Sequence, residues 1–124
     1  MNGMERTHMN INTLVTEAHQ IALDHGWWKK YYKLLLALPD DDELSDDLED
    51  YVINSCLMLM ASELGEACEA LRNGDEVNLA EELADVVIRV ADFCGWRCID
   101  LESAIAEKME KNRSRPYLHG GKKL

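Results

Sequence analysis

Apolar residues recur at intervals of three and four along most of the chain, and this period predicts helices. The first helix is expected from Asn12 to a stop near His25 and Gly26, because glycine commonly ends helices. No strand-like alternation persists for more than a few residues. Three further helices are expected over residues 48–72, from a cap at Asn78 to about Trp96, and from a cap at Asp100 to about Arg113.

Polar or irregular segments separate these helices. Residues 34–38 are expected to form a short helical turn that ends at Pro39, because proline lacks the N–H that a helix interior needs. The acidic stretch over residues 40–50 is interpreted as a solvated loop that leads into the next helix. We expect a flexible lead-in over residues 1–10, one domain over residues 11–115 and a tail over residues 116–124. Short connections between antiparallel helices favour an all-α bundle.

The composition fits one globular domain and excludes some functions. The 124 residues include 13 Lys and Arg against 24 Asp and Glu, a net charge of −11. A nucleic-acid partner is not expected, because phosphate backbones need a basic face. A membrane partner is not expected either, because no apolar run is long enough to span a bilayer. The four cysteines are interpreted as reduced core thiols, which indicates a cytoplasmic location.

The long helix over residues 48–72 carries two carboxylates near its apolar residues. Glu63 and Glu66 are three positions apart, which places both on one side of the helix. Glu63 is expected at the edge of buried surface. The core stripe of this helix is expected to contain Leu57, Met60, Leu64, Ala67 and Leu71.

The next helix repeats the arrangement with two apolar stripes. One stripe contains Leu79, Leu83, Val86, Val90 and Phe93, and the other contains Ala84, Ile88, Ala91 and Gly95. Between them runs a narrow polar line of Glu82, Asp85, Arg89 and Asp92. A helix that is apolar on two sides is expected to be buried on two sides. One small bundle cannot cover so much apolar surface, so we expect a dimer at least.

Four acids placed beside apolar surface need a counter-charge, because burying unpaired carboxylates is costly. Two nearby arginines are too few to neutralise them. A magnesium ion binds a few carboxylate oxygens together with water and phosphate oxygens. We therefore expect a site for Mg²⁺, with Mn²⁺ able to substitute, at Glu63, Glu66, Glu82 and Asp85. The alternative is a solvated helix face on which these acids form intrahelical ion pairs.

At these residues the sequence resembles the MazG-like all-α nucleoside triphosphate pyrophosphohydrolases. The signature of that family is ExxE, a variable gap and then ExxD. Here it reads Glu63-Leu-Gly-Glu66 and Glu82-Leu-Ala-Asp85. The flanks SELGEACEALR and EELADVVIRVADFCG, the segment HGWW and the tail KMEKNRSRPYLHGGK are also similar. Many members carry a further Glu directly before ExxE, where this chain has Ser62.

The resemblance implies a four-helix bundle that forms a homodimer or a dimer of dimers. It implies Mg²⁺-dependent hydrolysis of a nucleoside triphosphate, expected to be a dNTP, to the monophosphate and pyrophosphate. Such an enzyme would clear non-standard or surplus nucleotides. Glu63 or Glu66 is expected to act as general base toward a water that attacks the α-phosphorus.

Other residues are expected to bind the nucleotide. A group with helical spacing near the end of the last helix would bind phosphate, and the resemblance assigns its asparagine to the nucleoside. Two tryptophans would stack on a base. The candidates are Lys108, Asn112, Arg115, Lys122, Trp27 and Trp28. The alternatives are an ordinary solvated helix end and a tail for the first four, and core packing for one of the tryptophans.

Two other functions stay open. Phosphoribosyl-ATP pyrophosphohydrolase shares the helical scaffold in family terms. A non-catalytic acidic helical module that binds a protein partner would suit the net charge of −11 equally well. The variant Glu63→Gln separates the second alternative, because it would remove the activity of an enzyme and would be nearly silent in such a module.

Overall fold

The computed structural model describes residues 9–117, and every regular element in that range is a helix. The elements are α1 (Ile11–Asp24), α2 (Lys29–Ala37), α3 (Asp42–Arg72), α4 (Glu76–Arg97) and α5 (Leu101–Arg113). The expected all-α fold is confirmed. None of the helices within residues 9–117 is long and apolar enough to cross a membrane.

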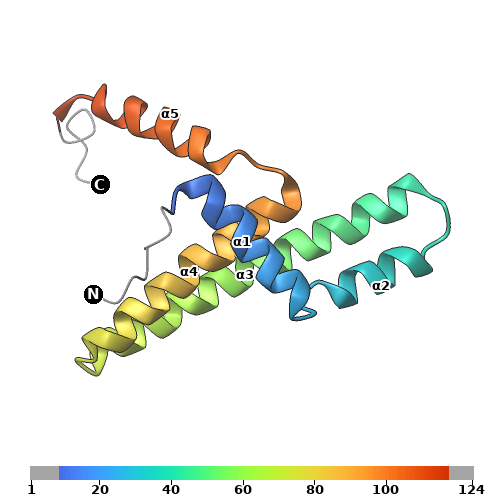
Figure 1. The fold of residues 1–124 in the computed structure, drawn as a ribbon, viewed down its shortest axis with the longest axis horizontal. Coiled ribbons are helices and arrows are strands. Elements are labelled where there is room, and N and C mark those ends of the chain that lie inside the picture. Colours follow the sequence, from blue (N-terminus) through green and yellow to red (C-terminus); the bar gives the residue numbers. More distant parts are fainter. Residues whose placement is uncertain (1–8, 118–124) are drawn as a thin grey trace, which may run out of the picture.

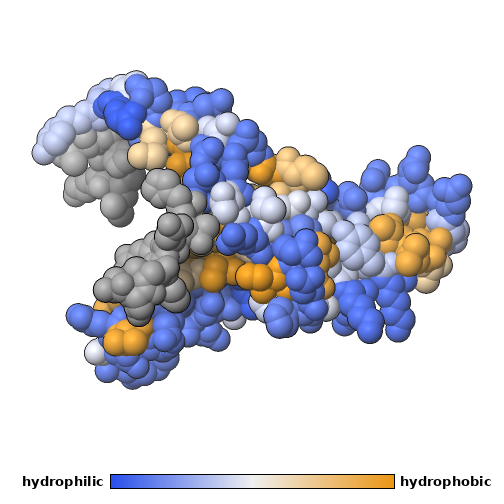
Figure 2. Space-filling view, in the orientation of Figure 1, coloured by the Kyte–Doolittle hydropathy of each residue, from blue (hydrophilic) through white to orange (hydrophobic). Residues whose placement is uncertain are grey.

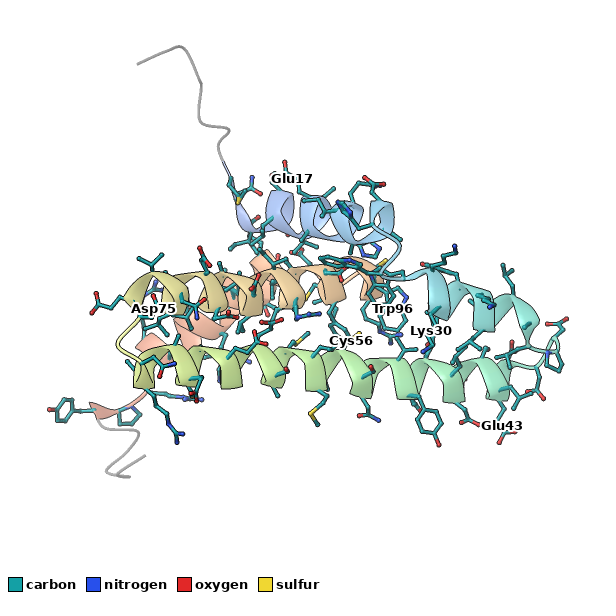
Figure 3. The ribbon with its side chains drawn as sticks, turned by 90° about the horizontal axis from the view of Figure 1, so that it is seen from below. Glu17, Lys30, Glu43, Cys56, Asp75 and Trp96 are labelled. Carbon is teal, nitrogen blue, oxygen red and sulfur yellow. The ribbon has the colours of Figure 1, made fainter. Side chains whose placement is uncertain are left out.

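The helices α3 and α4 form a long antiparallel hairpin (Figure 1). Helix α1 packs on the other side of α4, so that α4 lies between α1 and α3 (Figure 3). Helix α3 extends well beyond α4, and α2 lies along this extension (Figures 1 and 3). Helix α5 leaves the hairpin and packs mainly against α1.

The acidic stretch between α2 and α3 is largely helical, so the expected loop over residues 40–50 is wrong. Helix α3 begins at Asp42, after Asp41 has accepted hydrogen bonds from the backbone N–H groups of Glu43 and Leu44. Both Asp42 and Glu43 lie in the first turn, where negative charge is favourable near the positive end of the helix dipole. The carboxylates therefore stabilise the start of a helix in a segment that was expected to be a loop.

Other helix boundaries agree with the sequence to different degrees. Helix α4 is capped by Asp75, whose carboxylate accepts the Asn78 N–H at 3.0 Å, so the cap expected at Asn78 is wrong. Helix α2 is longer than the expected turn and stops at Ala37, because a residue before proline favours extended backbone, as Leu38 adopts. The cap of α5 at Asp100 is confirmed.

The core within one chain is built mainly from small residues. One cluster joins α1 to α4 and contains Val15, Ala18, Ala91 and Cys94. Small side chains allow these two helices to approach closely. At Gly95 a Cβ atom would lie 2.5 Å from the Cβ of His19, so only glycine fits this crossing. The second cluster contains Ala22, Trp28 and Tyr31 and lies where α2 meets the hairpin.

Much of the expected apolar stripe on α3 is exposed in the single chain. Leu57, Leu64 and Leu71 are 50%, 50% and 66% exposed, although Ala67 is buried. The side of α3 that meets α4 instead presents Glu63, Ala67 and Ala70. Figure 2 shows hydrophobic side chains at the surface in several separate places. The expectation that these leucines pack inside one chain is wrong.

The cysteines are free, but they are not all core residues. Cys94 is buried and Cys56 is partly buried, whereas Cys68 and Cys98 are exposed. The expectation of reduced thiols agrees with these free cysteines. The expectation that they are core residues is wrong for Cys68 and Cys98.

Candidate active site

The hairpin of α3 and α4 brings three of the four expected metal ligands together. Glu63 and Glu66 come from α3 and Glu82 comes from α4. One carboxylate oxygen of each lies within 4.8 Å of the other two. Asp85, three residues beyond Glu82 on α4, is exposed and lies outside this group. We call Glu63, Glu66 and Glu82 the carboxylate cluster.

Glu82 is the least satisfied member of the carboxylate cluster. Its Oε2 atom is buried and has no hydrogen-bond partner among residues 9–117. The adjacent carboxyl group of Glu66, the burial of the Glu82 carboxyl group and the negative charge of Glu66 raise the pKa of Glu82 to about 7. The cause is the close approach of like charges away from water. Such an oxygen is able to bind a cation or a proton.

Glu63 is held by the one basic side chain that reaches the cluster in the described part of the chain. The Nε atom of Arg89 donates to Glu63 Oε1 at 2.8 Å. This hydrogen bond lowers the pKa of Glu63 below its usual range. One guanidinium cannot neutralise three carboxylates. The donor set of the cluster, which consists of carboxylate oxygens that include the buried and unpartnered Glu82 Oε2, fits a hard divalent cation.

An apolar pocket lies beside the carboxylate cluster, because Arg89 both bonds to Glu63 of the cluster and lines the pocket. The pocket has a volume of about 450 Å³ and is walled mainly by aromatic and aliphatic side chains from α2, α3, α4 and the turn before α2. Lys30, Cys56 and Trp96 lie in this region, where α2, α3 and α4 meet (Figure 3). The lining residues are Trp27, Trp28, Lys30, Tyr31, Leu34, Val52, Ser55, Cys56, Leu59, Arg89, Asp92 and Phe93.

A polar network lies at the α1 side of this pocket. Asp92 Oδ1 accepts a hydrogen bond from Trp28 Nε1 at 2.9 Å and lies 2.8 Å from His19 Nδ1. These contacts join α1, the turn before α2, and α4. The Trp28 ring is also stacked on Trp96, with ring centroids 4.8 Å apart. The network fixes the orientation of the Asp92 carboxylate.

The two tryptophans that were expected to bind a base occupy different environments. Trp28 is 5% exposed and packed in the core cluster, whereas Trp27 is 59% exposed. Both line the pocket. Core packing of one tryptophan therefore agrees with the structure, and Trp27 is the aromatic ring with a free surface.

The structure does not bring the residues of α5 to the carboxylate cluster. Lys108 and Asn112 on α5, and Arg115 just after its end, are all exposed. Helix α5 packs mainly against α1, and Figure 1 shows it leading away from the hairpin. Lys122 lies outside the described residues.

Three residues that shape the site were not among the expected site residues. Arg89 and Asp92 were assigned to the polar line on α4, and that line was the available signal for both. His19 lies in the apolar pattern of α1, and nothing local in the sequence marks it as the partner of Asp92. Its position depends on the crossing of α1 and α4.

A comparison with protein families identifies a match to residues 41–119, which is well over half of the chain. The matching family model is described as the MazG nucleotide pyrophosphohydrolase domain. The matched segment includes α3, α4 and α5 and therefore all residues of the carboxylate cluster. Neither the curated proteins nor the solved structures that were compared contain a match to this chain.

Proposed function

Since the chain belongs to the MazG nucleotide pyrophosphohydrolase family, we propose that it hydrolyses a dNTP to the monophosphate and pyrophosphate in a Mg²⁺-dependent reaction. The observation that carries this proposal is the carboxylate cluster, with its unpartnered Glu82 oxygen, beside an apolar pocket. The two features suit the two ends of a nucleotide. The cluster suits the cation-bound phosphates, and the pocket suits the nucleoside.

The carboxylate cluster is proposed as the metal site. Glu63, Glu66 and Glu82 would provide ligand oxygens, and Asp85 is proposed as a fourth ligand from the sequence spacing alone. A divalent cation bound there, Mg²⁺ or Mn²⁺ in its place, would offset the charge of the triphosphate and lower the pKa of a bound water.

The chemical step needs a residue that accepts a proton. A water oxygen bonds to the α-phosphorus, the bond from that phosphorus to the oxygen bridging the α- and β-phosphates breaks, and pyrophosphate leaves. Glu63 and Glu66 are the two expected bases. Because Glu63 is occupied by Arg89, we assign the proton to Glu66. Arg89 lies between the cluster and the pocket, where its charge favours the polyanionic end of the substrate.

The nucleoside is proposed to occupy the apolar pocket, with its base against Trp27. The pocket volume of about 450 Å³ lies within the range of small-ligand sites. Lys108, Asn112, Arg115 and Lys122 are proposed as phosphate and nucleoside contacts because of the family resemblance. Since α5 stands away from the hairpin in one chain, we propose that its residues serve the site of a second copy.

Self-association belongs to this proposal. Exposed leucines on α3 and an α5 that packs mainly against α1 favour a homodimer or a dimer of dimers. The free cysteines support a reducing cytoplasmic location. A soluble pool of surplus or non-standard dNTPs would be the substrate in that compartment.

A pyrophosphate-release assay tests the function. Common ribo- and deoxynucleoside triphosphates are incubated with and without Mg²⁺, with Glu63→Gln and the exposed α3 control Glu69→Gln in parallel. We expect Mg²⁺-dependent pyrophosphate release, reduced by roughly 100-fold or more in Glu63→Gln and unchanged in Glu69→Gln. Release of orthophosphate as the first product would contradict the proposed reaction.

A further inference from the structure

Asp92 is the only acidic residue among the described side chains that line the apolar pocket. Its side chain is 15% exposed, so water screens its charge only in part. The two cations of the lining do not neutralise it. Arg89 is bonded to Glu63, and neither Arg89 nor Lys30 forms an ion pair with Asp92 in the described chain. His19 Nδ1 contacts Asp92 Oδ1 and pairs with its charge only when the imidazole is protonated. The proposed function gives no role to this carboxylate.

The hydrogen bonds of Asp92 use only one of its two oxygens. Trp28 Nε1 and His19 Nδ1 both lie on Oδ1, at 2.9 and 2.8 Å. No hydrogen bond from residues 9–117 reaches Oδ2. The indole N–H can only donate, so the oxygen that it contacts must be an acceptor. This bond holds the Asp92 carboxylate in one orientation. Oδ2 is therefore a fixed acceptor that the protein leaves free.

We propose that Oδ2 of Asp92 selects nucleotides whose base carries an exocyclic amino group, in preference to uracil and thymine. The proposal rests on the assignment of the pocket to the nucleoside. Cytosine, adenine and guanine each offer an NH₂ donor, and a carboxylate accepts from such a group. Uracil and thymine have a carbonyl oxygen at the position of the cytosine amino group, and their ring N–H lies to one side of it. A carboxylate that faces a carbonyl gains no hydrogen bond and loses its solvation.

Matched nucleotide pairs test the selection directly. CTP and UTP, or dCTP and dUTP, differ only where cytosine has an amino group and an unprotonated ring nitrogen and uracil has a carbonyl and an N–H. We expect kcat/KM of the wild type to be roughly 10- to 100-fold higher for the cytosine member, as for one hydrogen bond to a charged group. Equal values, or a preference for uracil, would overturn the proposal.

The variant Asp92→Asn makes the test sharper, because it predicts a reversal. The substituted side chain keeps one oxygen, which accepts from Trp28 Nε1 because an indole N–H can only donate, and so its amide NH₂ takes the place of Oδ2. An NH₂ group donates to the uracil carbonyl and opposes the cytosine amino group. We expect the ratio of kcat/KM for CTP to kcat/KM for UTP to fall to one or below. An unchanged ratio would contradict the proposal.

A control separates this effect from the loss of a charge. Glu49→Gln also removes one negative charge, which acts on the nearby Tyr31 and pairs with Arg97. Glu49 itself does not line the pocket. Its CTP to UTP ratio should equal that of the wild type. Near-ultraviolet circular dichroism of the tryptophans shows whether Asp92→Asn keeps the native packing.

Binding measurements keep the inference separate from the proposed function. Calorimetric titration of the wild type with CMP and UMP needs no catalysis, and no variant has to fold. Tighter binding of CMP without pyrophosphate release from any nucleotide would support the role of Asp92 and contradict the proposed reaction. Pyrophosphate release without discrimination between CTP and UTP would support the proposed reaction and contradict the role of Asp92.

Discussion

At the scale of single residues, the protonation of Glu82 dominates the metal-free site. Three carboxylates share a small volume, and only Glu63 has a basic partner in the described chain. The repulsion raises the pKa of Glu82 to about 7, so that this residue binds a proton at pH values where glutamate is ordinarily ionised. Between about pH 4.5 and 7, the folded protein therefore binds a proton that the unfolded chain releases.

This proton makes the stability of the metal-free protein depend on pH. The pKa of Glu82 is raised from 4.5 to about 7, so its protonation stabilises the fold fully below about pH 4.5. That contribution is lost as the pH rises through about 7. Glu82→Gln removes the repulsion at every pH. In EDTA we expect the variant to have a higher Tm than the wild type at pH 8, and a much smaller advantage at pH 5.

The neighbouring residue supplies the control for this measurement. Glu81 is exposed on α4 and lies outside the carboxylate cluster, so Glu81→Gln should show no such change with pH. Addition of Mg²⁺ should raise the Tm of the wild type more than that of Glu82→Gln, because a ligand of the folded state stabilises it. A Glu82→Gln protein less stable than the wild type at pH 8 would show that repulsion is not the governing effect.

The sequence indicated the carboxylates better than it indicated their partners. The spacings Glu63 to Glu66 and Glu82 to Asp85 define sides of two consecutive helices. The antiparallel hairpin brings Glu63, Glu66 and Glu82 together, whereas Asp85 lies outside the group. The Arg89 bond and the Asp92 network depend on how α4 is rotated toward α3 and α1. That rotation is set by packing along the whole helix and has no local sequence signal.

At the scale of elements, the crossing of α1 and α4 positions Asp92. His19 on α1 lies against Gly95 on α4, three residues after the Asp92 that it contacts. A methyl group at Gly95 would meet His19 Cβ at 2.5 Å and the Val15 carbonyl oxygen at 3.2 Å. Neither is the end of a flexible side chain. The helices would have to move apart, and the His19 contact with Asp92 would lengthen.

We therefore predict that Gly95→Ala destabilises the protein by about 1–3 kcal/mol through overpacking. Gly65, in the middle of α3, has no atom within 4 Å of its ideal Cβ position. Gly65→Ala should stabilise the protein by about 0.5–1 kcal/mol, because alanine favours a helix interior. Urea denaturation at one fixed protein concentration measures both. An unchanged free energy of unfolding in Gly95→Ala would mean that α1 and α4 pack less closely at this crossing than the structure indicates.

The helices themselves were largely predictable, and their errors have a common cause. The stops at Gly26 and Pro39 and the cap at Asp100 follow from local backbone chemistry. The charge of the acidic stretch at the start of α3 predicts solvation but does not exclude a helix. Those carboxylates instead cap the helix and favour its positive end. The cap of α4 was expected at Asn78, but Asp75 occupies that position, and both residue types serve as helix caps.

At the scale of the whole molecule, the apolar surface exceeds what the fold covers. In the part of the chain that the structure describes, no large side chain is fully buried. Helix α4 is covered by α1 at Ala91 and Cys94, but Leu83 and Val87 nearer its start are about half exposed. On α3, Leu57, Leu64 and Leu71 repeat every seven residues. Such a seam is typical of helices that pack against another helix.

This seam predicts self-association in solution. Sedimentation at micromolar concentration should give a dimer or a larger assembly for the wild type, and a monomer would contradict the prediction. Leu64→Asp places a charge in the middle of the seam and should weaken association by roughly 10-fold or more, because a buried unpaired charge is costly. Met58→Asp is the control, since Met58 is 69% exposed on another side of the same helix. If Leu64→Asp dissociates the assembly and also abolishes pyrophosphate release while Met58→Asp does neither, the active site depends on the second copy. If the dissociated protein keeps full activity, each chain holds a complete site, and the residues of α5 then have no role across subunits.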